Sequence, residues 1–176
     1  MFKKILFISL GVIVALIIGF IAIGFIKPTY EGGITVTVNA PVSTTFAYFN
    51  NTDNMAKWMD NFKSIENISG EKNQVGSKWK LVYDENGSDL VMTETVTAFE
   101  QDKLFAFVME DEYFKMDIEI RFEEKDGKTI ITQIDKGEGK NLPARSMVAI
   151  MGSLGLMQKQ QQGMYNKLKD LVEKTQ

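Results

Sequence analysis

Three hydrophobic patterns follow one another along the chain. Residues 5–26 are continuously apolar, residues 34–135 alternate apolar and polar positions with a period of two, and residues 142–174 repeat apolar positions with a helical period. This order predicts one apolar helix able to span a membrane, a strand-rich middle region and a C-terminal helix.

The middle region is predicted to form seven strands in antiparallel arrangement. Asn86-Gly87 and Asp126-Gly127 are tight-turn signals, because Asn or Asp followed by Gly tolerates positive φ, and they place two hairpins. Two short helices, over residues 42–50 and 53–58, are expected after the first strand. The predicted strands are residues 34–39, 64–69, 76–83, 88–99, 103–110, 113–123 and 128–135.

The C-terminal pattern predicts one long helix over residues 142–174 that covers the sheet. Met147, Ile150, Met151 and Leu154 share one face of it, so we expect these side chains to point into the groove of the sheet. The uncharged run from residue 146 to 157 is too short to cross a bilayer. Internal glycines should loosen this helix locally.

The N-terminal apolar run is predicted to be a membrane anchor. Its 22 uncharged residues would extend ~33 Å as a helix, the thickness of a hydrocarbon core. Lys3 and Lys4 precede it and only Lys27 follows closely, which favours a cytoplasmic N-terminus and a domain outside. A cleaved secretory signal ending near Ala22-Ile23-Gly24 is the competing interpretation. The predicted division is residues 1–27 as anchor, 28–33 as linker and 34–176 as one folded domain.

Composition restricts the chemistry of this domain. The chain contains neither His nor Cys, which excludes Ser-His-Asp triads, Cys-His dyads and zinc sites of the usual ligands. No metal and no cofactor is therefore expected. After Lys27 there are 17 basic and 23 acidic residues, a net charge of −6, which disfavours nucleic acid as a partner and electrostatic docking to anionic lipid.

Residues 39–58, 96–104 and 168–173 carry a resemblance to a known superfamily. Asn39-Ala40-Pro41 leading to Trp58, Val96 to Leu104, and Leu168 to Glu173 are similar to the START-like, or SRPBCC, superfamily of polyketide cyclase/dehydrase-like proteins. The resemblance implies an α+β helix-grip fold, in which a curved, antiparallel seven-stranded sheet grips a long C-terminal helix. It further implies an apolar cavity between them, used in the superfamily for lipids, sterols and polyketides.

Side chains on alternating strand positions are expected to line this cavity. Glu94 interrupts an apolar alternation, and if it points inward, desolvation should raise its pKa and make it the best candidate for binding a polar group or for acid/base catalysis. A β-bulge or register slip would instead turn it outward. The other predicted ligand-binding residues are Trp79, Leu81, Tyr83, Met92, Val96, Phe114, Met116, Ile118, Met147, Met151 and Leu154.

Three functions fit the sequence. The leading hypothesis is a membrane-tethered module that binds a hydrophobic small molecule or lipid. The first alternative is a polyketide cyclase/dehydratase-like enzyme that uses Tyr, Glu or Asp in the same cavity. The second is an envelope interaction domain whose fold is packed shut, and the volume of the cavity separates this alternative from the other two.

Overall fold

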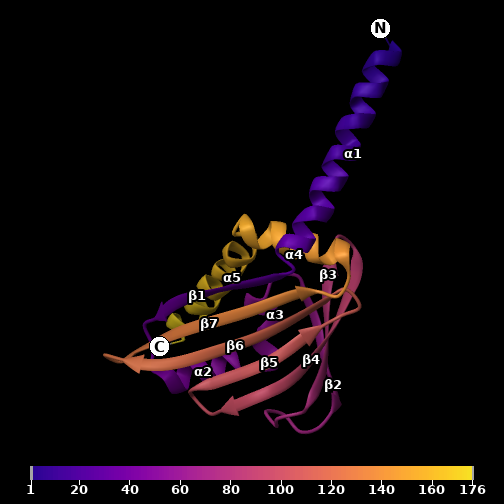
Figure 1. Cartoon of the computed structure of the whole chain (residues 1–176). Helices are drawn as coiled ribbons and strands as arrows, with labels where there is room; N and C mark the ends of the chain where they lie inside the picture. The colour runs from indigo at the N-terminus through magenta and orange to yellow at the C-terminus, as the bar shows by residue number, and fades with distance from the viewer. Residues whose placement is uncertain (1, 176) are drawn as a thin grey trace.

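Seven antiparallel strands form one curved sheet in the computed structural model, which describes residues 2–175 (Figure 1). Six of them follow one another as a meander, and the first strand pairs with the last, giving the order β1-β7-β6-β5-β4-β3-β2. The α+β class and the seven strands agree with the sequence prediction. The strands are β1 (Thr29–Val38), β2 (Phe62–Ser69), β3 (Lys78–Glu85), β4 (Ser88–Glu100), β5 (Leu104–Glu110), β6 (Phe114–Lys125) and β7 (Lys128–Gly139).

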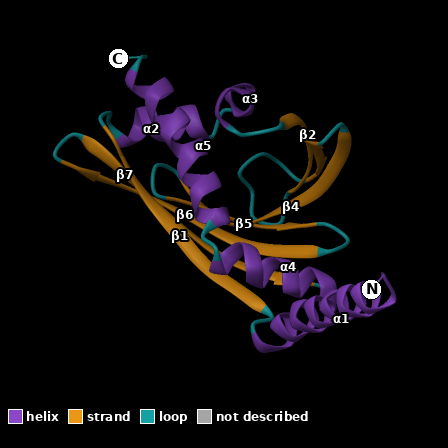
Figure 2. Cartoon of the chain, turned by 90° about the horizontal axis from the view of Figure 1, so that it is seen from above, coloured by secondary structure: helices purple, strands orange, loops and turns teal. Residues whose placement is uncertain are grey.

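Helices cover the concave face of this sheet, as Figure 2 shows from above. Helix α5 crosses the face and contacts β1, α2 and α3, whereas α4 contacts β7 and β1 near one end of the sheet. The helices are α1 (Phe2–Ile26), α2 (Val42–Phe49), the 3-10 helix η1 (Thr52–Asn54), α3 (Met55–Trp58), α4 (Leu142–Ser153) and α5 (Leu156–Glu173). This arrangement is the predicted helix grip.

The two predicted hairpins form at the tight-turn signals. Asn86 and Gly87 have φ of 54° and 87°, and Asp126 and Gly127 have φ of 53° and 72°. Two consecutive positive φ values match the twist of the strands that they connect. The hairpins therefore fix the registers of β3 with β4 and of β6 with β7.

The first strand begins earlier than predicted, so residues 28–33 are not a linker. From Thr29 onward the chain pairs with β7, with Gly32 opposite Asp135, and Lys136 forms an ion pair with Glu31 at 3.1 Å. The two glycines in this segment resemble a flexible link in sequence, but β7 supplies a partner for the backbone of each. Only Lys27 and Pro28 separate α1 from the sheet.

The C-terminal segment forms two helices, which corrects the prediction of one. Gly155 adopts left-handed backbone angles (φ 66°, ψ 18°) between α4 and α5. Helices commonly stop at such a glycine because a Cβ is costly in this conformation. The turn lets α4 pack on the end of the sheet while α5 follows the groove. Gly152 in α4 leaves room for the ring of Tyr30, which a Cβ there would meet.

Replacing Gly155 with Ala tests this helix break. Gly155→Ala is expected to lower the free energy of unfolding by about 1–2 kcal/mol, because alanine is strained at positive φ. Gly163→Ala is the matched control, for which we expect a change in the free energy of unfolding of the opposite sign. Gly163 lies within α5 with open space around it, so the free energy of unfolding of this variant should rise by about 1 kcal/mol. Denaturant unfolding of the full chain in detergent, followed by tryptophan fluorescence, checks both, and equal signs would contradict the expectation.

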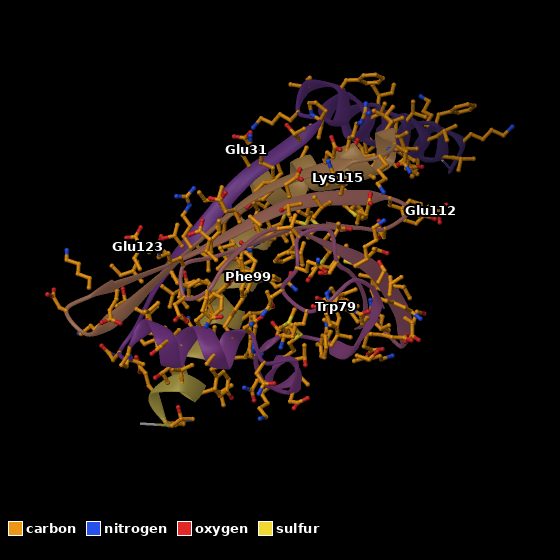
Figure 3. All side chains as sticks on the ribbon, turned by 90° about the horizontal axis from the view of Figure 1, so that it is seen from below. Glu31, Trp79, Phe99, Glu112, Lys115 and Glu123 are labelled. Carbon is orange, nitrogen blue, oxygen red and sulfur yellow. The ribbon has the colours of Figure 1, made fainter. Side chains whose placement is uncertain are left out.

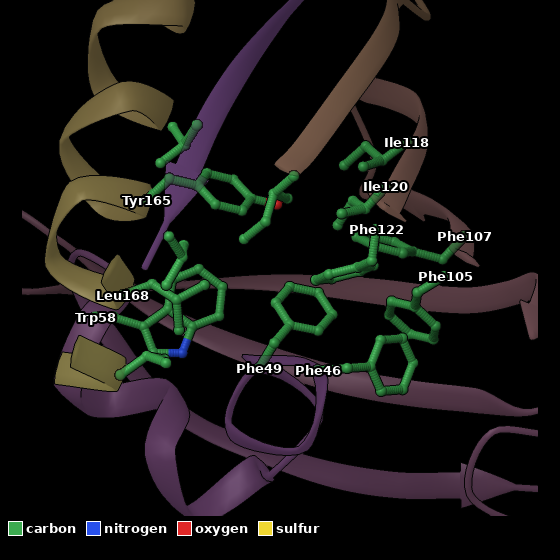
Figure 4. Packing of buried hydrophobic residues seen from close by; sticks show 14 of the residues in the cluster. Phe46, Phe49, Trp58, Phe105, Phe107, Ile118, Ile120, Phe122, Tyr165 and Leu168 are labelled. Atoms are coloured by element: carbon green, nitrogen blue, oxygen red, sulfur yellow. The ribbon is translucent and has the colours of Figure 1, made fainter. Parts of the chain in front are cut away.

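Aromatic rings fill the space between the sheet and α2 (Figure 4). The ring of Phe46 is fully buried, and its centroid lies 4.9 Å from Phe122 and 5.8 Å from Phe99. Phe49 contacts Phe122 and Trp58 at centroid distances of 5.2 and 5.7 Å. This end of the helix grip is therefore solid, and any cavity must lie farther along α5.

Helix α1 projects away from the domain (Figure 1). Residues Lys3–Ile26 form the one helix among residues 2–175 that is long and apolar enough to cross a membrane, and its most apolar stretch is not buried against the domain. Only its last turns contact the domain, at α4. By length and composition a signal sequence passes the same test.

Candidate functional site

A cavity of about 450 Å³ lies between the concave face of the sheet, α3 and α5. Figure 3 shows Trp79 inside the curve of the sheet, whereas Glu31 lies at the outside. The cavity begins where the aromatic packing under α2 ends, because Phe49 and Trp58 line it and Phe46 does not. Most predicted residues line it, namely Trp79, Leu81, Tyr83, Met92, Glu94, Val96, Met116, Ile118 and Met151.

Phe114, Met147 and Leu154 do not line the cavity, which corrects three predictions, and Ile150, which was predicted to point into the groove of the sheet, does not line it either. Phe114 begins β6 beyond the end of the cavity and packs beside Tyr113. Met147 and Leu154 are 49% and 67% exposed, because α4 turns its small residues to the sheet and α1 and leaves these side chains outside. The helical stripe was correct for α5, whereas in α4 only Met151 of the predicted residues lines the cavity.

Several lining residues were missed in the sequence prediction. Phe105, Phe107 and Met109 alternate along β5 and face the cavity. Their period of two was the available signal, the same one that identified β6. On the other wall, Met157 and Gln161 of α5 belong to the predicted helical stripe and line the cavity as well.

Glu94 points into the cavity, as predicted. It lies opposite Trp79 on β3 and Met109 on β5, and its side chain is only 5% exposed. The β4–β5 pair does contain a bulge, but between Val96 and Ala98, so the register at Glu94 is intact. Loss of solvation on burial raises the pKa of Glu94 to about 7. Near neutral pH the group therefore exists in both protonation states.

Tyr83 faces the same space as Glu94. Burial, and secondarily the negative charge of Glu94, raise the pKa of Tyr83 above its ordinary value. The phenol therefore remains protonated near neutral pH and is available as a hydrogen-bond donor. Glu94 and Tyr83 are thus two polar groups on the strand wall of the cavity, on β4 and β3 respectively.

A second polar group lies between β7 and α5. The Tyr165 hydroxyl donates to Gln133 Oε1 (2.6 Å), Gln133 Nε2 donates to Asp135 Oδ1 (2.6 Å), and Gln161 Nε2 donates to Asp135 Oδ2 (2.8 Å). Burial raises the pKa of the Asp135 carboxyl, and the two amide donors oppose this shift. The network joins α5 to the sheet, and Gln133, Gln161 and Tyr165 also line the cavity.

Two buried polar atoms of cavity-lining residues have no hydrogen-bond partner within residues 2–175. They are Gln161 Oε1, an acceptor on α5, and Trp58 Nε1, a donor on α3. Buried polar atoms without partners are costly, so each is available to a ligand or to solvent in the cavity. Together with Glu94, these two atoms could pair with a donor or with an acceptor on a ligand.

Two contacts at the rim hold the surrounding loops. Lys72 Nζ donates to the Asn50 carbonyl oxygen at 2.7 Å, which joins the β2–β3 loop to the end of α2. Lys167 of α5 forms an ion pair with Asp60, which precedes β2. Across the described residues 2–175, no three His, Cys, Asp or Glu side chains lie close enough together to hold a metal ion.

Comparison with protein families assigns most of the folded domain. Residues 33–172 match the family described as polyketide cyclase / dehydrase and lipid transport. A search of curated proteins found no match. Among solved structures, 295 chains are similar. The three compared below are only 14–15% identical to this chain, so their similarity indicates a shared fold alone.

Three of these structures illustrate the fold. The Zhui aromatase/cyclase from Streptomyces sp. R1128 has a TM-score of 0.67 at 14% identity, covering 82% of this chain and 94% of its own. A START superfamily protein from Mycobacterium smegmatis has a TM-score of 0.64 at 15% identity, with coverage of 84% and 99%. Protein SA2116 from Staphylococcus aureus, of unknown function, has a TM-score of 0.64 at 15% identity, with coverage of 85% and 96%. The chain therefore belongs to the polyketide cyclase / dehydrase and lipid transport family and has its helix-grip fold.

Proposed function

We propose that the protein is a membrane-tethered module that binds a hydrophobic small molecule or lipid carrying one polar group. The observation that carries this proposal is the cavity of about 450 Å³, whose surface is mainly apolar with polar side chains at defined positions. This volume lies in the range of about 300–1,000 Å³ that is usual for small-molecule sites. It argues against a domain that is packed shut.

The polar residues of the cavity indicate how such a ligand would be oriented. Glu94 and Tyr83 lie on the strand wall, and the unpartnered atoms of Trp58 and Gln161 lie on the helical wall. A ligand with a hydroxyl or a similar group would satisfy one of them while its apolar body contacts methionine and aromatic side chains. Methionine adapts to irregular shapes, which favours ligands of varied form.

The tether is α1, which we place across the membrane with its N-terminus in the cytoplasm. Residues Lys3–Ile26, 24 in number, have the length to cross, and Lys3 and Lys4 outnumber Lys27. The ligand class is supported by analogy, because the family is described by lipid transport and one structural neighbour is a START superfamily protein. Retention of α1, rather than its removal as a signal, is part of the proposal.

Blocking the cavity tests the binding function. Met92→Trp on β4 should fill the cavity, whereas Val91→Trp is the matched control, because Val91 is 45% exposed on the opposite face of the same strand. Each full-length variant is purified in the same detergent from the same membranes, and retained small molecules are identified by mass spectrometry. We expect Met92→Trp to lose about 90% of a molecule that both the unmodified chain and Val91→Trp retain.

Glu94→Gln adds a second comparison to this experiment. Replacing a charged or ionisable hydrogen-bond partner should cost about 1.5–3 kcal/mol of binding, which is at least a tenfold loss of affinity. Identical sets of retained molecules in all four proteins would refute the binding function. An effect of Met92→Trp without an effect of Glu94→Gln would leave a purely apolar binder.

Glu94 and Tyr83 favour one alternative, a polyketide cyclase/dehydratase-like enzyme. A carboxyl group with a pKa of about 7 can accept and return a proton at neutral pH, and a protonated phenol that lines the same cavity can donate a hydrogen bond to a developing oxyanion. If the retained molecule is converted by the unmodified chain and not by Glu94→Gln, this alternative replaces the binding function.

A further inference from the structure

Helix α4 exposes an apolar face that no described residue covers. Met147 and Leu154, the residue that caps the C-terminus of α4, are seven positions apart, so they lie on the same side, and Leu156 begins α5 directly after the turn. The opposite side of α4 packs on the sheet, where Val148 Cγ1 approaches Gly137. The exposed side chains therefore point away from the domain. Large apolar side chains grouped in this way mark a contact surface.

The end of the apolar helix α1 lies on α4. A Cβ placed on Gly24 would lie 2.9 Å from Ser146 N and 3.0 Å from the Leu142 carbonyl oxygen, closer than ordinary packing allows. The two backbones therefore meet directly at Gly24, as small residues permit between helices. In Figure 1, α4 runs across the base of α1, which points away from the domain.

This contact fixes the depth of α4 relative to any membrane that α1 crosses. Gly24 lies two residues before the end of α1, which is ~3 Å along the helix axis. If residues 5–26 occupy the hydrocarbon core, α4 must lie at its boundary, in the headgroup region. The exposed apolar face of α4 is thus continuous with the surface of the anchor.

The segment that forms α4, the turn and most of α5 is basic, although the chain as a whole is acidic. Residues 139–169 contain five Lys or Arg and no Asp or Glu, in a chain whose net charge is −3. Lys140, Lys167 and Lys169 are paired with acidic side chains, whereas Arg145 and Lys159, and Lys27 at the end of α1, are exposed and form no ion pair with residues 2–175. The overall negative charge of the domain therefore conceals a basic segment at the base of the anchor.

We propose that α4 and the α4–α5 turn dock into the interface of the bilayer that α1 spans. Met147, Leu154 and Leu156 enter the boundary between headgroups and acyl chains, and the exposed cations lie at the level of the phosphates. This inference rests on the proposed anchoring function of α1. It places Met151 and Met157, which line the cavity on either side of the turn, next to the bilayer, so an apolar ligand would exchange with the membrane there.

The absence of cysteine makes the docking surface directly measurable. Single variants Met147→Cys and Leu154→Cys of the full chain are labelled with bimane and reconstituted into vesicles of phosphatidylcholine and phosphatidylglycerol with brominated acyl chains. Val14→Cys within α1 reports the anchor, and Ile68→Cys, 54% exposed on β2, reports a domain surface remote from α4. We expect strong quenching at 14, 147 and 154, at least threefold above that at 68.

The controls separate failure of docking from failure of anchoring. Quenching at 14 with values at 147 and 154 equal to that at 68 would overturn docking and leave the anchor in place. No quenching at 14 would overturn both. Combining Gly24→Leu with Met147→Cys should separate α1 from α4 and at least halve the quenching at 147, and unchanged quenching would overturn the role of the α1–α4 contact.

Discussion

Phe46→Ala is expected to lower the free energy of unfolding by about 3–5 kcal/mol. Phe46 is fully buried and lies against Phe49, Phe99 and Phe122, so the variant loses the burial of a whole ring and leaves a void that three rigid neighbours fill poorly. The measurement is denaturant unfolding of the full chain in detergent, followed by the fluorescence of its two tryptophans.

The control for this expectation is an exposed aromatic residue. Tyr113→Ala removes a ring that is 49% exposed, and we expect less than about 1 kcal/mol of destabilisation. A loss below about 1 kcal/mol for Phe46→Ala would show that the aromatic packing under α2 adapts freely. In that case the boundary between the solid end of the helix grip and the cavity would not be fixed by Phe46.

The sequence predicted the sheet well because strand and turn signals are local. The alternation in β6 is unbroken from Phe114 to Glu123, and the Asn-Gly and Asp-Gly pairs required positive φ at the hairpins. Glu94 was predicted to point inward only because side chains alternate between the two faces of a strand. The prediction was correct because the bulge in β4 lies after Glu94, between Val96 and Ala98. The alternation of side chains along a strand predicts their direction reliably up to the first bulge.

The C-terminal segment was less predictable because its environment is not local. The apolar period continues from Met151 through Leu154 to Met157, so it gives no sign of the helix break at Gly155. Which face of α4 is buried depends on α1, a segment more than 100 residues distant in the chain. Asp135 was unpredictable for a related reason, since its donors come from Gln133 beside it and Gln161 on another helix.

Burial of Glu94 gives the protein a second large expected effect, a stability that falls as the pH rises. The folded pKa is about 7 against an ordinary value of 4.5, so between these values the folded protein holds a proton that the unfolded chain has released. Below about pH 4.5 both states are protonated and no penalty exists, and above pH 7 both are ionised and the full penalty is present. A shift of this size corresponds to on the order of 3 kcal/mol.

Glu94→Gln isolates this contribution, because an amide of nearly the same shape does not titrate. Burial also raises the pKa of Asp135, so the unmodified chain and the variant share that part of the pH dependence, and only their difference reports on Glu94. We expect the stability of Glu94→Gln, relative to the unmodified chain, to rise between pH 4 and pH 8 by on the order of 3 kcal/mol.

The measurement is a series of denaturant unfolding curves of the full chain in detergent from pH 4 to pH 8, with Glu66→Gln on the exposed surface of β2 as the matched control. A constant difference between Glu94→Gln and the unmodified chain across this range would mean that solvent in the cavity hydrates the Glu94 carboxylate. The cavity would then be a wet site, and its ligand would have to displace water from Glu94 before binding. A difference that rises through pH 5–7 in Glu94→Gln, and not in Glu66→Gln, identifies a dry environment around Glu94, in which its carboxyl group is held partly protonated at neutral pH.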